Sequence, residues 1–99
     1  MAEFDAIVIG GGHNGLVTAG YLSRAGARVL VLEKRGIVGG ACVTEEPWPG
    51  FKISTFGYAA GLLRPQIVEE LELKRFGFAP ILCAPQGFSP FPDGRALTM

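Results

Sequence analysis

The sequence has few cysteines and histidines and no excess of charge of either sign. Its 99 residues include two cysteines and one histidine, and nine Lys and Arg balance nine Asp and Glu. Cys42, Cys83 and His13 are too few for a disulfide framework or a metal site. We therefore expect no metal and a reducing compartment, the cytoplasm. A net charge of zero gives no electrostatic attraction for nucleic acid, which excludes a nucleic-acid partner.

The sequence also lacks a credible membrane or export segment. Ala6–Ser23 contains no Asp, Glu, Lys or Arg and is long enough to span a membrane. Its middle reads Gly-Gly-Gly-His-Asn-Gly, however, which is typical of a turn. No basic region precedes it, as a signal peptide would require. We predict a strand followed by a glycine turn, with no transmembrane segment and no transit signal.

One strand–helix–strand unit is present near the start of the chain. Phe4–Ile9 is rich in β-branched residues, which favours a strand buried on both faces of a parallel sheet. Asn14–Ala25 predicts a helix, and Gly26 ends it. Arg28–Leu32 predicts a second buried strand, with Glu33 directly after it. The predicted fold class is α/β, with a right-handed, Rossmann-like βαβ unit for FAD or NAD(P).

The remaining sequence has a different texture. Segment 34–50 is rich in glycine and proline, so we expect turns with little regular structure, including a solvated turn at Glu45–Glu46. Beyond it we expect a short strand, a helix in which Glu70 faces Lys74, a further strand and a hairpin with a Pro-Asp-Gly turn. These four elements are expected at 51–55, 65–77, 81–83 and 88–99.

A dinucleotide-binding sheet combines two βαβαβ halves, and only one βαβ unit is visible here. Two parallel strands with one helix leave the sheet edges open. We therefore expect residues 1–44 to form the cofactor-binding βαβ unit with the glycine-pair loop that follows it. Residues 45–99 are expected to be the start of a truncated inserted segment. The chain is predicted to be the N-terminal portion of a larger protein and to fold poorly on its own.

The predicted turn after the first strand carries the pattern Gly10-x-Gly12-x-x-Gly15. Gly10 permits the tight turn, Gly12 lets a pyrophosphate approach the backbone, and Gly15 allows close packing of helix and strand. The start of the helix offers unpaired N–H groups and partial positive charge. Glu33 follows at roughly the 20-residue spacing of such motifs and can accept hydrogen bonds from a ribose. The pattern therefore predicts a dinucleotide site.

The same residues bear on which dinucleotide is bound. Glu33 would repel the 2′-phosphate of NADP, although Lys34 and Arg35 keep that alternative open. FAD and NAD share an AMP half, so the βαβ unit alone does not separate them. Gly39-Gly40 stand where a plain NAD domain usually enters a crossover helix. A glycine pair there favours a cofactor longer than its adenosine half, namely FAD.

Several segments resemble a known family. Asp5–Val17, Leu32–Arg35 and Val38–Thr44 are similar to the start of FAD-dependent oxidoreductases of the phytoene desaturase and amine oxidase superfamily. The likeness extends to a phytoene-dehydrogenase-like branch through Gly12–Leu16, Gly39–Glu46, Leu62–Ile67 and Leu71–Lys74. The resemblance implies a larger FAD-dependent enzyme that transfers hydride to or from an apolar or amine-bearing small molecule. It also implies the mitochondrial matrix as an alternative location for eukaryotic relatives, and it leaves a homo-oligomer open.

The resemblance also implies cofactor contacts. The backbone of residues 12–14 would hold the FAD pyrophosphate, and Glu33 would take the adenosine ribose. Arg35 and Gly40-Ala41 would line the path toward the flavin, although many members carry Arg in place of Ala41. The segment 57–58 is expected near the isoalloxazine, and no catalytic acid or base is evident. The full set of expected cofactor-binding residues is Gly10, Gly12, His13, Asn14, Gly15, Glu33, Lys34, Arg35, Gly39, Gly40 and Ala41.

Two other functions remain alternatives. One is a catalytically silent protein that binds a dinucleotide and acts in regulation or interaction. The other is an NAD-dependent dehydrogenase. The colour and absorption spectrum of the purified protein would separate them from a flavoenzyme.

Overall fold

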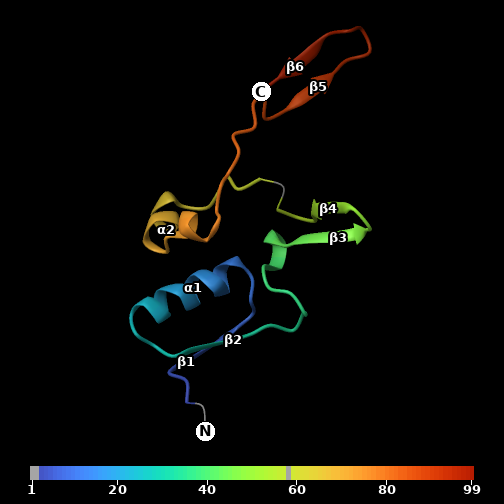
Figure 1. Ribbon diagram of the computed structural model, residues 1–99. Coiled ribbons are helices and arrows are strands. Elements are labelled where there is room, and N and C mark those ends of the chain that lie inside the picture. The colour runs from blue at the N-terminus through green and yellow to red at the C-terminus, as the bar shows by residue number, and fades with distance from the viewer. Residues whose placement is uncertain (1–2, 58) are drawn as a thin grey trace.

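A computed structural model describes residues 3–57 and 59–99 of the chain. Helices and strands alternate along the first half, and two hairpins lie further along (Figure 1). In chain order the elements are β1 (Ala6–Ile9), α1 (His13–Arg24), β2 (Val29–Leu32), the 3-10 turn η1 (Gly40–Cys42), β3 (Thr44–Trp48), β4 (Phe51–Ser54), α2 (Pro65–Glu70), the 3-10 turn η2 (Leu73–Phe76), β5 (Phe88–Pro90) and β6 (Ala96–Thr98).

The predicted βαβ unit is present. β1 and β2 pair in parallel, from Ala6 opposite Val29 to Ile9 opposite Leu32, and α1 packs against both strands. The last helical residue is Arg24, and Gly26 terminates the helix as predicted by taking a left-handed φ of 91°, a conformation that favours glycine. Its N–H bonds to the Ser23 carbonyl at 3.0 Å, and the next N–H bonds to the Leu22 carbonyl at 3.1 Å. The α/β class predicted from the sequence is confirmed.

Only one face of this strand pair is covered. Val8 lies toward α1, since its Cγ1 is 3.3 Å from where a Cβ on helical Gly15 would be. Strand alternation puts Ile7 and Ile9 on the other face, where they are 59% and 87% exposed. The prediction of strands buried on both faces is therefore wrong for the described residues. α1 covers one face, and no second described helix covers the other (Figure 1).

The segment predicted to lack regular structure contains strand β3. It pairs antiparallel with β4, from Thr44 opposite Ser54 to Trp48 opposite Phe51, around a turn in which Gly50 has a φ of 85°. The two glutamates predicted in a solvated turn lie in this strand. Glycine and proline content indicated turns, but backbone pairing with β4 imposes the strand. An irregularity between residues 45 and 48 accommodates the proline within it.

The predicted helix from Pro65 is interrupted. α2 ends at Glu70, and Glu72 takes a left-handed conformation with a φ of 53° before η2 begins. Glu70 and Lys74 therefore do not lie one turn apart on a continuous helix, and their predicted pairing is wrong. The Glu70 carboxylate instead accepts a hydrogen bond from the Tyr21 hydroxyl of α1 at 2.5 Å. Tyr21 lies 49 residues away in sequence, and the local partner of the carboxylate is Gln66, whose side-chain amide donates to the other oxygen at 2.8 Å.

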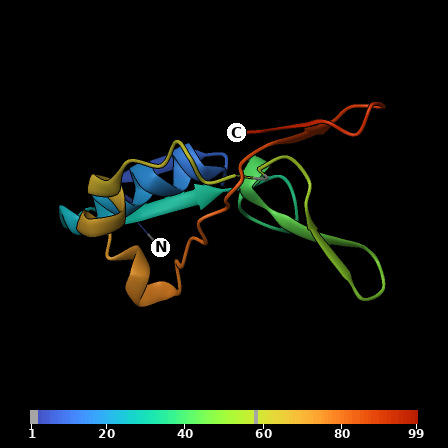
Figure 2. The same ribbon diagram turned by 90° about the horizontal axis from the view of Figure 1, so that it is seen from above.

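The C-terminal hairpin is confirmed, but the strand predicted at 81–83 is wrong. β5 and β6 pair from Phe88 opposite Thr98 to Pro90 opposite Ala96, around the predicted Pro-Asp-Gly turn. Residues 81–83 form no strand because no described segment pairs with them. Figure 2 shows both hairpins projecting away from the βαβ unit.

The described chain is extended and has little core. Its radius of gyration is 18.2 Å, whereas a compact domain of this length would have about 13 Å. Among the described apolar side chains, only Ala19 and Val43 are buried. No helix in the described ranges has the length and apolarity needed to cross a membrane. The packing contacts that could position a site are therefore those among β1, α1 and β2.

Candidate dinucleotide site

The glycine turn between β1 and α1 brings the strand end unusually close to the helix. Gly10 has a φ of 101°, and its N–H bonds to the Leu32 carbonyl at 2.7 Å. A Cβ on Gly15 would lie 2.0 Å from the Gly10 carbonyl oxygen, a distance that side chains do not tolerate. The tight turn and close packing expected of these two glycines are both present.

Gly12 lacks a side chain for a different reason. Its φ of −76° and ψ of 176° suit any residue, and the nearest atom to an added Cβ is the Gly40 Cα at 3.8 Å. Neither backbone conformation nor neighbouring atoms of the protein require glycine here. A ligand lying against the main chain would require it, which is the geometry of a pyrophosphate cradle.

The start of α1 is free to meet an anion. Among the described residues, no side chain caps this helix end, and its first turn contains no acidic residue. The Leu16 N–H bonds to the Gly12 carbonyl at 2.9 Å, and the N–H groups before it lie in the uncapped first turn. His13 and Asn14 occupy this turn and are exposed. The resulting cluster of donors, with the positive end of the helix dipole, suits a phosphate.

Glu33 is fixed beside this turn by two backbone hydrogen bonds. One carboxylate oxygen accepts the Arg35 N–H at 2.9 Å, and the other accepts the Gly11 N–H at 2.7 Å. The bond from Arg35 and then the bond from Gly11 lower the pKa of Glu33 below its usual range. The carboxylate is therefore ionised at neutral pH. Each oxygen keeps a second lone pair that can accept a hydrogen bond from a ribose hydroxyl.

Gly11 is a site residue that the sequence analysis missed. A Cβ on it would lie 3.2 Å from a Glu33 carboxylate oxygen and 3.1 Å from Val38 Cγ1. Its place in the middle of the Gly-Gly-Gly run could have pointed to it, because a residue without a Cβ lets its backbone approach a neighbouring carboxylate closely.

The second glycine segment lies directly against the first. The Gly39 N–H bonds to the Gly11 carbonyl at 2.7 Å, and Gly12 and Gly39 form a parallel bridge. Gly39 and Gly40 have φ values of 125° and 58°, and a Cβ on Gly40 would lie 2.9 Å from the Gly12 Cα. The structure thus brings together the glycine turn, Glu33 and the glycine pair. Exposed Ala41 follows within η1.

The two cations after Glu33 lie differently. Lys34 is exposed, whereas the Arg35 guanidinium reaches β3 and pairs with a Glu45 carboxylate oxygen at 2.5 Å. The other Glu45 oxygen accepts the Thr55 hydroxyl at 2.9 Å. Glu45 and Thr55 were not expected near the candidate site, because strand β3 was not predicted.

The segment expected near the flavin returns to the end of this site. A Cβ on Gly57 would lie 3.0 Å from the Ala41 carbonyl oxygen and 3.5 Å from the Cys42 Cα. Tyr58, the other residue named there, lies outside the described residues. Cys42 is exposed and unpaired with other cysteines. The described ranges contain no group of three or more His, Cys, Asp or Glu that could hold a metal ion.

Comparison with known proteins bears out the resemblance expected from the motifs. The chain is 54% identical over 96 residues to the pyridine nucleotide-disulfide oxidoreductase domain-containing protein 2 of Rattus norvegicus, covering 97% of this chain and 16% of that protein. It is 60% identical over 54 residues to one of the subunits of limonene dehydrogenase from Castellaniella defragrans, covering 54% of this chain and 10% of that protein.

A third relative is the all-trans-retinol 13,14-reductase of Macaca fascicularis, which is 52% identical over 42 residues, or 42% of this chain and 7% of that protein. The chain therefore spans less than a fifth of the length of these relatives. No solved structure matches the chain.

A family model described as an NAD(P)-binding Rossmann-like domain matches residues 8–71. The matched range begins within β1 and includes the glycine turn, Glu33 and the glycine pair. Because the match covers more than half of the sequence and agrees with the observed βαβ geometry, the chain belongs to the NAD(P)-binding Rossmann-like domain family.

Proposed function

We propose that this chain is the FAD-binding part of a flavin-dependent oxidoreductase. The bridge between Gly12 and Gly39 is the observation that carries the proposal. It lays a second stretch of bare backbone alongside the turn that suits a pyrophosphate. FAD and NAD both continue beyond the pyrophosphate, but a plain NAD domain usually enters a crossover helix where this chain lays Gly39 and Gly40 against the turn, so we propose FAD.

The proposed contacts follow the geometry of the site. The N–H groups of the first turn of α1, from His13 to Gly15, would donate to the pyrophosphate, with Gly10 and Gly12 keeping the approach open. The Glu33 carboxylate would accept hydrogen bonds from the adenosine ribose. The groups proposed to line the route toward the flavin are Lys34, Arg35, Gly39, Gly40 and Ala41.

FAD, when bound, supplies hydride transfer. This chain would contribute binding and orientation, since its site consists of backbone donors and one fixed carboxylate. The names of two relatives refer to limonene and to all-trans-retinol, which are apolar molecules. We accordingly propose an apolar small-molecule substrate, with an amine-bearing one as the alternative, bound by another part of the complete protein.

Purification of the protein from its complete reading frame tests this proposal. The expected result is a yellow protein with a flavin absorption spectrum, which is bleached by an apolar hydride donor such as limonene or, once the flavin has been reduced, restored by an apolar hydride acceptor such as all-trans-retinol. A colourless protein that binds NADH tightly would instead favour an NAD-dependent dehydrogenase, in keeping with the family description. Stoichiometric flavin that no reductant or substrate class alters would favour a catalytically silent protein.

A further inference from the structure

The ion pair between Arg35 and Glu45 connects the candidate nucleotide site to the β3–β4 hairpin. Arg35 Nη2 lies 2.5 Å from Glu45 Oε1, and the Thr55 hydroxyl donates to Glu45 Oε2 at 2.9 Å. Both oxygens of Glu45 are therefore engaged, one by the guanidinium and one by the hairpin. Arg35 belongs to the segment after β2, so the pair joins two parts of the chain that are separate in sequence.

Arg35 is well placed to influence recognition of a ribose. Its own backbone N–H holds the Glu33 carboxylate at 2.9 Å, so the residue begins beside the group that would accept the ribose hydroxyls. In Rossmann-like domains, an acidic residue selects a free 2′-hydroxyl, and a nearby arginine accommodates a 2′-phosphate. This chain carries both residue types two positions apart. Whether the Arg35 side chain extends toward the ribose or away from it therefore decides whether the site accepts a 2′-phosphate or selects a free 2′-hydroxyl.

We propose that Glu45 is a specificity-determining residue that withholds Arg35 from a 2′-phosphate. By holding the guanidinium against the hairpin, Glu45 leaves the Glu33 carboxylate as the dominant charge at the ribose position. The site then selects adenine nucleotides with a free 2′-hydroxyl. This inference rests on the proposed dinucleotide function and adds the class of nucleotide that the site accepts.

The same geometry makes the inference separable from stability. The Arg35 and Glu45 side chains are 47% and 36% exposed, and ion pairs exposed to this degree contribute little to folding. Removing the Glu45 charge should therefore release Arg35 without unfolding the hairpin. Glu46 offers a matched control, because it is the adjacent acidic residue and its carboxylate bonds instead to the Gly50 N–H at 2.7 Å.

The test compares two probes, adenosine 5′-diphosphate and adenosine 2′,5′-bisphosphate, by calorimetric titration. It uses the complete protein after removal of its cofactor, in preparations shown to rebind that cofactor. In Glu45→Gln we expect the preference for the diphosphate to fall about threefold to fivefold, since an exposed ion pair withholds the arginine only to that extent and a freed arginine can make charge-assisted hydrogen bonds to the 2′-phosphate. In Glu46→Gln the preference should stay unchanged. Adding Arg35→Gln to Glu45→Gln should restore it.

Arg35→Gln alone gives a measurement that does not depend on the Glu45 variant folding. If Glu45 withholds the guanidinium, this change alters the preference by less than about twofold. A large rise in preference would show that Arg35 already reads the 2′ position and would overturn the inference. Equal effects of Glu45→Gln and Glu46→Gln, or no effect of Glu45→Gln, would also overturn it.

Failure of the proposed function has a different signature. A wild-type protein that binds neither probe and retains no cofactor would remove the dinucleotide site itself, and this inference with it. A wild-type protein that binds the diphosphate, with a preference that Glu45→Gln leaves unchanged, would remove only the role of Glu45.

Discussion

The backbone N–H of Gly11 donates a 2.7 Å hydrogen bond to the carboxylate of Glu33, 22 residues further along the chain. This bond joins the turn after β1 to the end of β2, the two places from which a dinucleotide would be held. The approach favours glycine at position 11, because a Cβ there would lie 3.1 Å from Val38 Cγ1 and 3.2 Å from a Glu33 carboxylate oxygen. The turn proposed to meet the phosphate and the carboxylate proposed to meet the ribose are therefore joined directly.

Glu33→Gln should weaken cofactor binding in the complete protein. The amide keeps one acceptor oxygen, but it loses the negative charge and one of the two acceptor groups. Hydrogen bonds to charged acceptors are the stronger class, so we expect FAD affinity to fall about tenfold or more. Flavin titration followed by fluorescence measures this change. Glu69→Gln, which removes an exposed acidic group of α2, is the control, and an equal loss in both variants would contradict a ribose contact by Glu33.

The free energy of unfolding should vary with pH through the ionisation of Glu33. Its pKa is lowered by the Arg35 and Gly11 N–H groups, so the folded state holds the ionised form more strongly than the unfolded state. The stabilisation is fully present above the ordinary carboxyl pKa of about 4.3 and is lost as the pH falls through the lowered value. Thermal unfolding of wild type and Glu33→Gln between neutral and acidic pH checks this. The difference between the two should shrink on the acid side, and a difference that grows there would contradict the assignment.

Substitutions at Gly12 and Gly15 should separate binding from folding. Gly12→Val adds a side chain where the protein leaves space, so the fold should persist while flavin retention is abolished. Gly15→Ala places a Cβ 2.0 Å from the Gly10 carbonyl oxygen, so it should destabilise the fold by about 1–3 kcal/mol, as overpacking does. The flavin-to-protein absorbance ratio and the unfolding midpoint measure the two effects. Stoichiometric flavin in Gly12→Val would refute the pyrophosphate cradle.

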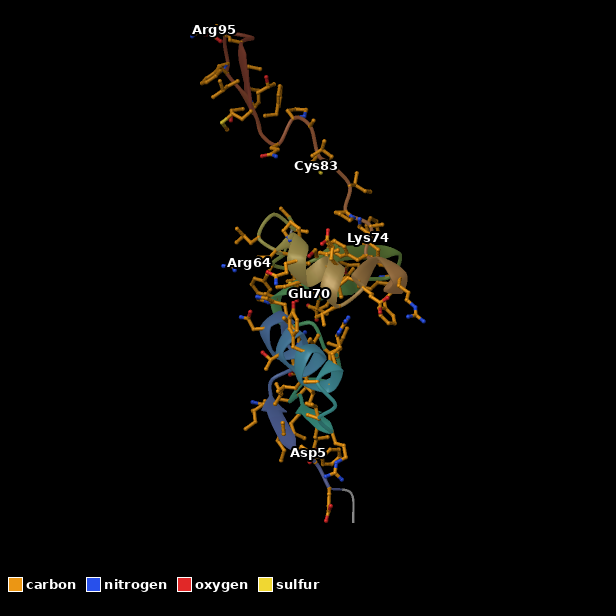
Figure 3. The ribbon with its side chains drawn as sticks, turned by 90° about the vertical axis from the view of Figure 1, so that its left-hand side faces the viewer. Asp5, Arg64, Glu70, Lys74, Cys83 and Arg95 are labelled. Carbon is orange, nitrogen blue, oxygen red and sulfur yellow. The ribbon has the colours of Figure 1, made fainter. Side chains whose placement is uncertain are left out.

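Tyr21→Phe should loosen the contact between α1 and α2. The Tyr21 hydroxyl bonds to the Glu70 carboxylate at 2.5 Å, and Arg24 donates to the Glu70 carbonyl. Figure 3 shows Glu70 on α2, next to α1. We expect amide hydrogen exchange in α2 to rise about threefold or more, while α1 is unaffected. Thr18→Val is the control, because among the described residues the Thr18 hydroxyl bonds to the Asn14 carbonyl within α1, at 2.8 Å. Unchanged exchange in α2 would show that the Tyr21 hydroxyl does not hold it.

The same bond predicts a pH window for the docking of α2. The bond to Glu70 raises the pKa of Tyr21, so the stabilisation that this bond gives to the docking of α2 is lost as the pH rises through that raised pKa. The bond from Tyr21 lowers the pKa of Glu70, so the contribution is also lost as the pH falls through that lowered value. Exchange protection in α2 should therefore be greatest at intermediate pH in wild type. In Tyr21→Phe it should no longer fall at high pH, whereas part of the fall at low pH should remain because Gln66 also lowers the pKa of Glu70.

The 99-residue chain expressed alone should be partly molten. Only Ala19 and Val43 are buried among its described apolar side chains, and Ile7 and Ile9 lie on an uncovered sheet face. We expect strong binding of the dye ANS and a broad thermal transition. A sharp two-state melt with a dispersed amide NMR spectrum would contradict this expectation.

Local chemistry was enough to predict the βαβ unit. The conformational freedom of Gly10 and Gly26 and the apolar runs of β1 and β2 act over a few residues, so they are legible in the sequence. The division at residues 44 and 45 and the cofactor contacts themselves stay predictions. The strand expected at 81–83 failed because apolar content alone does not supply a pairing partner.

The glycine turn, the helix it opens and the acidic residue after β2 follow from residues close along the chain, so they are legible in the amino-acid sequence. Three further contacts are known from the folded chain: Gly39 pairs with the glycine turn, Arg35 turns to Glu45, and Glu70 bonds to Tyr21 rather than facing Lys74. These contacts join residues whose separation along the chain leaves no local pattern to read.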